Sequence, residues 1–133
     1  MMTAGPEKEE HWRWRYAMAE AIASALDAER FGVKAFYLLG STKNATAGPG
    51  SDIDLLIHIE EDGRKTEALS LWLDGWSRCL GTINTLKTGI ETESLLDIHY
   101  VTDDDIMNKT SYAVKIDAVT DAARRLETGG AND

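Results

Sequence analysis

The chain has little cysteine, a minority of positive charge and no long apolar run. Cys79 is its single cysteine, so neither an internal disulfide nor a metal cluster built from cysteines can form. No run of about 18 uninterrupted apolar residues occurs, which predicts no membrane span. Residues 1–10 are polar and acidic and lack the apolar core of a secretory signal. We therefore expect a cytoplasmic protein without membrane contact.

Positive charge is scarce, because 14 Lys and Arg face 23 Asp and Glu and the net charge is −9. Proteins that bind nucleic acid usually neutralise several phosphates with clustered Lys and Arg, so a nucleic-acid partner is disfavoured. A small phosphorylated ligand is still compatible with the charge. A divalent metal held by carboxylates can supply positive charge locally.

Length and composition predict one domain over residues 1–133, with loose ends at about 1–10 and 128–133. At 43% hydrophobic residues, the chain has enough apolar material for a single core. A small sheet protein with four tryptophans can expose apolar surface. A homodimer or a protein partner is therefore a further expectation.

The periodicity of apolar residues predicts the order helix, strand, strand, helix, strand. A β-branched and aromatic run ends at Gly40-Ser41, and a loop rich in breaking residues follows, in which a short helix directly after Ser41 stays open. A short helix is expected after Val101, whereas the segment beyond it has features of both strand and helix. The predicted helices are 11–30, 65–87 and 103–109, the predicted strands 33–39, 52–60 and 94–101, and the undecided segments 112–119 and 117–126.

Aspartates carry the chemistry of this pattern. Successive strand residues point to opposite faces, so Asp52 and Asp54 project from one side while the isoleucines and leucine between and after them face the core. Asp97 lies in the next apolar strand. If the two strands pair, three carboxylates meet, and they can hold two Mg²⁺ ions for transfer of a phosphoryl or nucleotidyl group, with Asp97 as general base.

Gly40 and Ser41 offer contacts for the phosphate groups of a nucleoside triphosphate. Glycine lets the backbone approach a phosphate closely, and serine offers a hydroxyl and an amide hydrogen. The two residues therefore form a candidate nucleotide-binding pair.

The combined pattern resembles the DNA polymerase beta-type nucleotidyltransferase superfamily, and most closely its small single-domain members. Leu-Gly-Ser at 39–41, ten intervening residues, Asp-Ile-Asp-Leu at 52–55 and Leu-Asp-Ile at 96–98 carry the resemblance. It implies an α+β fold with a small mixed sheet and helices packed on it. It also implies Mg²⁺ and a nucleoside triphosphate, ATP by default, as ligands, and transfer of a nucleoside monophosphate with release of pyrophosphate.

The resemblance places Gly40 and Ser41 at the phosphate and Asp52, Asp54 and Asp97 at the metals. Many small members also carry a basic residue two or three positions after the Gly-Ser pair, where it can touch phosphate. Lys43 is the only candidate in this loop, and it is assigned to the nucleotide on that basis.

Several side chains keep two interpretations. His58 and His99 share the aspartates' faces and could position a substrate, although a histidine at a strand end is more often structural. Trp72 and Trp76 could stack on a base, although aromatics on an amphipathic helix usually pack in the core.

The first functional hypothesis is a Mg²⁺-dependent nucleotidyltransferase acting on an unknown hydroxyl acceptor, either a small molecule or a protein. The alternative is a nucleotide-binding or regulatory protein, or an antitoxin-like partner protein, that keeps the fold without efficient transfer. Its motivation is size, because little chain remains after Val101 to recognise an acceptor.

Overall fold

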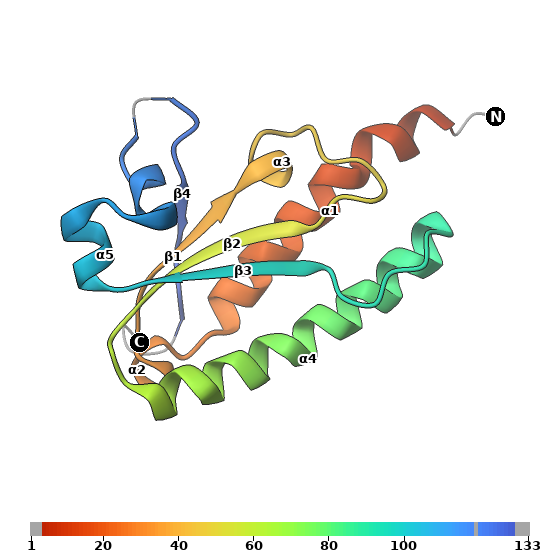
Figure 1. Ribbon diagram of the computed structural model, residues 1–133. Helices are drawn as coiled ribbons and strands as arrows, with labels where there is room; N and C mark the ends of the chain where they lie inside the picture. Colours follow the sequence, from red (N-terminus) through yellow and green to blue (C-terminus); the bar gives the residue numbers. More distant parts are fainter. Residues whose placement is uncertain (1–3, 119, 130–133) are drawn as a thin grey trace.

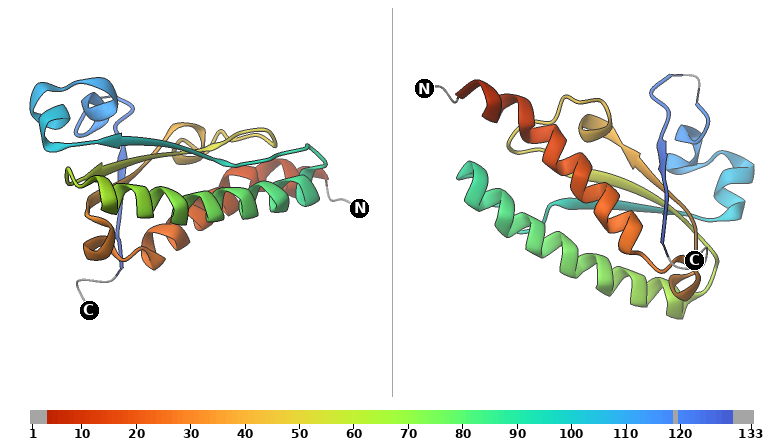
Figure 2. Two further views of the ribbon diagram at one scale, coloured as in Figure 1. Left: turned by 60° about the horizontal axis from the view of Figure 1, so that its bottom comes forward. Right: turned by 180° about the vertical axis from the view of Figure 1, so that it is seen from behind.

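Two long helices cover one face of a four-stranded sheet in this computed structural model, which describes residues 4–118 and 120–129 (Figure 1, Figure 2). They are α1 (Ala4–Ala25) and α4 (Gly63–Thr88). The Asp62 carboxylate caps the start of α4 by accepting two backbone N–H groups, and Gly89 ends the helix in the left-handed conformation. No helix in the described part of the chain combines the length and apolar character needed to cross a membrane.

The sheet is mixed, as the predicted α+β fold requires. Its order is β3-β2-β1-β4, with β1 antiparallel to both β2 and β4 and with β2 parallel to β3. Helix α4 makes the crossover that two consecutive parallel strands need. The strands are β1 (Val33–Leu39), β2 (Ile53–Ile59), β3 (Leu96–Val101) and β4 (Arg124–Leu126).

Strand β2 shows how the sheet separates two environments. Its odd-numbered residues are buried in the main core beneath α1 and α4. Its even-numbered residues face the other side of the sheet, where Leu56 belongs to a second, smaller apolar cluster and Asp54 and His58 are only half-buried. The alternation therefore directs the charged side chains to the face that the long helices leave open.

The C-terminal part of the chain covers only a portion of that open face (Figure 1, Figure 2). It consists of α5 (Asp103–Asn108), the 3₁₀ helix η1 (Ser111–Lys115) and the segment that leads into β4. Thr102 begins α5 with a capping box, since its hydroxyl accepts the Asp105 N–H and the Asp105 carboxylate accepts the Thr102 N–H. Partial cover leaves a cavity beside half-buried Asp54 and exposed Asp97.

The first predicted helix, 11–30, is wrong at both ends. Helix α1 begins at Ala4, inside the segment expected to be a loose end, and a separate short helix α2 (Ala28–Phe31) follows. Asp27 adopts an extended conformation between them and its carboxylate accepts the Arg30 N–H, which starts a new helix instead of continuing the old one. Gly129 pairs with Asp27 in an isolated bridge, so the other expected loose end also has a structural contact.

The undecided C-terminal segments contain a short 3₁₀ helix and strand β4, and neither was predicted. Strand β4 is three residues long, which is too short for a recognisable alternation. Its position depends on antiparallel pairing with β1, where buried Leu126 lies opposite Phe36. The short helix that stayed open after Ser41 is present as α3 (Gly40–Lys43).

Candidate active site

Two aspartates from neighbouring strands face each other at the centre of the site. The parallel register of β2 and β3 makes Asp54 and Asp97 direct partners, and their side chains are hydrogen-bonded. Burial raises the pKa of Asp54 to about 6, and the hydrogen bond and negative charge of Asp97 act in the same direction. Two carboxylates that face each other repel, so the pair is an energetically favourable place for a cation.

Asp52 lies just before β2 begins and is exposed. Atoms packed around its carboxyl still desolvate it and raise its pKa, the charge of Asp97 adds to this effect, and the charge of Arg15 opposes it. No three acidic, histidine or cysteine side chains within the described residues are close enough together to hold a metal. The structure therefore brings Asp54 and Asp97 together, with Asp52 near enough to repel them but not part of the same cluster.

Gly40 lies against the Asp54 carboxylate at the end of β1. Its φ is +71°, a left-handed conformation that favours glycine, and a Cβ at this position would collide with the Asp54 side chain. The backbone turn into α3 is therefore in direct contact with the Asp54 carboxylate. Ser41 follows in α3, and its carbonyl accepts the Thr46 N–H at 2.8 Å, which closes the loop that begins there.

A cavity of about 220 Å³ opens beside these groups. Of the residues predicted from sequence, Gly40, Asp54 and Asp97 line it, whereas Asp52, Ser41 and Lys43 do not. The remaining lining residues are Leu39, His99, Tyr112, Lys115 and Asp121.

Residues 22–120 match the family described as "Nucleotidyltransferase domain". The chain belongs to the nucleotidyltransferase domain family. The matched range covers about three-quarters of the chain and includes every residue that carried the resemblance, which is thereby confirmed. Searches of curated proteins and of solved structures found no significant match.

An aromatic side chain that sequence reasoning missed lies over this candidate site. The Tyr112 ring stacks on His99 with ring centroids 3.9 Å apart, and His99 Nε2 is 3.4 Å from Asp97 Oδ2. Tyr112 belongs to η1, within a segment whose secondary structure was undecided. No local signal could have placed it at the site, because its position depends on how η1 folds back over β3.

Trp72 and Trp76 of α4 pack against the core, which was the second of the two interpretations that the sequence left open. Trp72 and Trp76 pack edge to face on each other, and Trp72 also contacts Phe31, on the helix-covered side of the sheet. His58 is hydrogen-bonded to Asp103 at 2.7 Å and does not line the cavity. Neither tryptophan lines it either.

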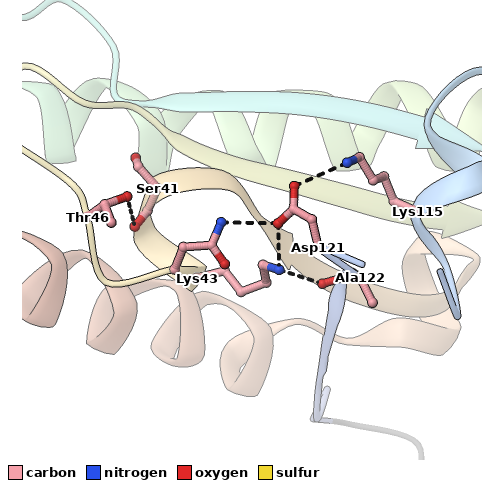
Figure 3. A network of polar contacts seen from close by, with 7 residues as sticks. Ser41, Lys43, Thr46, Lys115, Asp121 and Ala122 are labelled. Atoms are coloured by element: carbon pink, nitrogen blue, oxygen red, sulfur yellow. Dashed lines mark hydrogen bonds and ion pairs between the residues drawn. The ribbon is translucent and has the colours of Figure 1, made fainter. Parts of the chain in front are cut away.

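Lys43 contacts the C-terminal segment of the chain. Its ammonium group donates to the Asp121 carboxylate at 2.9 Å and to the Ala122 carbonyl at 2.7 Å, and its side chain is only 11% exposed. Asn44 and Lys115 donate to the same carboxylate (Figure 3). These donors together hold the pKa of Asp121 far below its usual range.

Arg15 of α1 holds the loop that leads to Asp52. The side chain is fully buried and donates to the carbonyls of Pro49 and Ser51, at 3.1 and 2.9 Å, and to Asn84 Oδ1 at 2.8 Å. Asn84 of α4 in turn donates to the Pro49 carbonyl. The two long helices therefore fix the backbone directly before Asp52, a contribution that no sequence motif indicated.

Proposed function

We propose that this nucleotidyltransferase domain transfers a nucleoside monophosphate from a nucleoside triphosphate, ATP by default, to a hydroxyl group of a small molecule or protein. The facing pair of Asp54 and Asp97 beside Gly40 is the observation that carries the proposal. Paired carboxylates at the edge of a cavity supply the hard oxygen ligands that Mg²⁺ prefers, and close approach of the glycine backbone admits a phosphate.

The three carboxylates would have two roles, metal binding and acceptance of a proton. Asp54 and Asp97 would hold the metal, with Asp52 joining when its exposed side chain turns toward them. When bound, two Mg²⁺ ions would neutralise the triphosphate and lower the pKa of the acceptor hydroxyl. The acceptor oxygen attacks the α-phosphorus, its proton passes to Asp97, and the bond to the departing pyrophosphate breaks as the new phosphorus–oxygen bond forms.

Calorimetric titration of ATP, with Mg²⁺ and with EDTA, is the direct test. Wild-type protein should bind ATP only with Mg²⁺, and Asp54→Asn and Asp97→Asn should each weaken this binding at least tenfold, because each removes a negatively charged ligand. Asp74→Asn is the matched control, since Asp74 is exposed on α4, is paired with Arg78 and does not line the cavity.

The acceptor is then sought with ATP labelled at the α-phosphate. Transfer of label to a hydroxyl compound or protein, lost in Asp97→Asn, would support catalysis. Metal-dependent ATP binding without transfer to any acceptor would favour the regulatory alternative. If no triphosphate bound with Mg²⁺, or if both active-site variants bound as tightly as Asp74→Asn, the proposed function would be wrong.

A further inference from the structure

Tyr112 brings a hydroxyl-bearing side chain to the cavity that contains the paired aspartates. Of the described residues that line this cavity, Tyr112 is the one whose side chain has a hydroxyl group. The others are a glycine, a leucine, a histidine, a lysine and three aspartates. The proposed reaction needs a hydroxyl acceptor, and this tyrosine supplies that chemistry from within the chain.

The Tyr112 ring lies one imidazole away from Asp97. Its centroid is 3.9 Å from that of His99, with 31° between the two planes, and His99 Nε2 is 3.4 Å from Asp97 Oδ2. Asp97 is the residue to which the proposed mechanism gives the acceptor's proton. The tyrosine and the proposed general base therefore belong to one chain of side-chain contacts.

The Tyr112 hydroxyl has no partner that would restrain it. Tyr112 is 41% exposed, and within the described residues its hydroxyl makes no hydrogen bond. The hydroxyl of Tyr100, by contrast, is hydrogen-bonded to that of Ser70 at 2.9 Å. An exposed, unpartnered phenol can approach a phosphorus atom without the loss of a hydrogen bond.

We propose that Tyr112 is the acceptor of the nucleoside monophosphate, so that the chain modifies itself. Tyr112 Oη attacks the α-phosphorus of the bound nucleoside triphosphate, and the phenolic proton passes to Asp97. The bond to the departing pyrophosphate breaks as the new phosphorus–oxygen bond forms, which leaves a phosphodiester between the nucleoside and the tyrosine. The inference rests on the proposed function and names its acceptor.

A phenol is a suitable acceptor beside a carboxylate base. Tyrosine is among the side chains that form covalent bonds to transferred groups when a neighbouring base accepts the proton. Phenols lose a proton more readily than aliphatic alcohols, so a carboxylate is a sufficient base. An acceptor on the same chain also has a high effective concentration, which lowers the entropic part of the barrier.

Incubation with Mg²⁺ and ATP labelled at the α-phosphate tests the inference. Label should become covalently attached to the wild-type chain, and fragmentation mass spectrometry should place it on Tyr112. Tyr112→Phe keeps the ring that stacks on His99 and removes the hydroxyl, so this variant should lose the label. Asp97→Asn should be labelled about 10²–10⁴-fold more slowly, which is the usual contribution of a general base.

Tyr16→Phe is the matched control, because Tyr16 lines a different cavity, between α1 and β4. It should be labelled like wild type. A mixture of Tyr112→Phe, which keeps the carboxylates, and Asp97→Asn, which keeps the phenol, tests whether transfer stays within one chain. The mixture should remain as poorly labelled as its components, whereas label on the Asp97→Asn chain at the wild-type rate would overturn transfer within the chain.

Nitration by tetranitromethane tests the position of the phenol without any transfer. The analogue α,β-methylene-ATP occupies the nucleotide site but cannot react, because its carbon bridge does not break. At ten times its Kd with Mg²⁺, the analogue should reduce nitration of Tyr112 about tenfold and leave nitration of Tyr16 unchanged. Equal nitration of Tyr112 with and without the analogue would overturn the inference.

The two proposals fail separately. Label on a residue other than Tyr112, or a Tyr112→Phe variant that is labelled like wild type, would overturn the inference. Mg²⁺-dependent ATP binding that is lost in Asp54→Asn, together with an unlabelled wild-type chain, would also overturn it and leave the proposed function standing. Thermal unfolding checks that Tyr112→Phe is folded, and the mapping of label on the wild-type chain decides the question if that variant does not fold.

Discussion

Asp54→Asn should make the metal-free protein more stable at neutral pH. The pKa of Asp54 rises from its ordinary value of 3.8 to about 6 in the folded chain, so the native state binds more protons than the unfolded state between these values. Stability that is present below about pH 4 is therefore lost as the pH rises through 6. Asparagine has no proton to lose, so the variant should not show this component of the pH dependence.

The magnitude follows from the shift. About two pKa units correspond to roughly 3 kcal/mol. The Asp54 carboxyl is only half-buried, so solvent screening reduces the expected effect to about 1–2 kcal/mol. At about 4 °C per kcal/mol for a chain of this size, the variant should melt roughly 4–8 °C above wild type at pH 8 in EDTA.

Denaturant unfolding of both proteins from pH 4 to pH 8 in EDTA measures the difference directly. The difference in free energy of unfolding should grow across pH 4–7 and level off above pH 7, and Asp74→Asn should keep the pH slope of wild type. Addition of Mg²⁺ at pH 8 should stabilise wild type and leave Asp54→Asn unchanged. Parallel curves for wild type and Asp54→Asn across the whole range would refute the raised pKa of Asp54.

Three further predictions test the framework of the fold. Gly40→Ala should cost more stability than Gly89→Ala, because both glycines have positive φ but only a methyl group at the first would strike a carboxylate; equal costs by denaturant unfolding would contradict this contact. Gly75→Ala should stabilise α4 by about 0.5–1 kcal/mol, whereas Gly81→Ala in the same helix should destabilise it, because its methyl group would meet backbone carbonyls at 2.8 Å. Arg15→Met should cost roughly 3 kcal/mol, since it leaves the Ser51 carbonyl and the buried Asn84 Oδ1 without a donor, and a loss below about 1 kcal/mol would show that water replaces the guanidinium.

The main elements of the fold could be predicted from sequence, because local periodicity specifies them. Strand β1 was predicted with its observed bounds, Val33–Leu39, and β2 and α4 were each predicted to within two residues. The break at Asp27 was missed because an aspartate is tolerated inside a helical pattern, and only its capping geometry shows that a second helix begins there. Strand β4 was missed because its three residues become a strand only by pairing with β1.

For the site, the sequence determined which side chains share a face, since alternation along a strand is local. It indicated that Asp54 and Asp97 would face a common side, but the parallel register that makes them partners depends on the crossover through α4 and on the core beneath it. Lys115, Asp121 and Tyr112 reached the site through contacts across 13 to 78 residues of chain. Such contacts leave no periodic trace in the sequence, because their geometry is set by the packing of the whole chain.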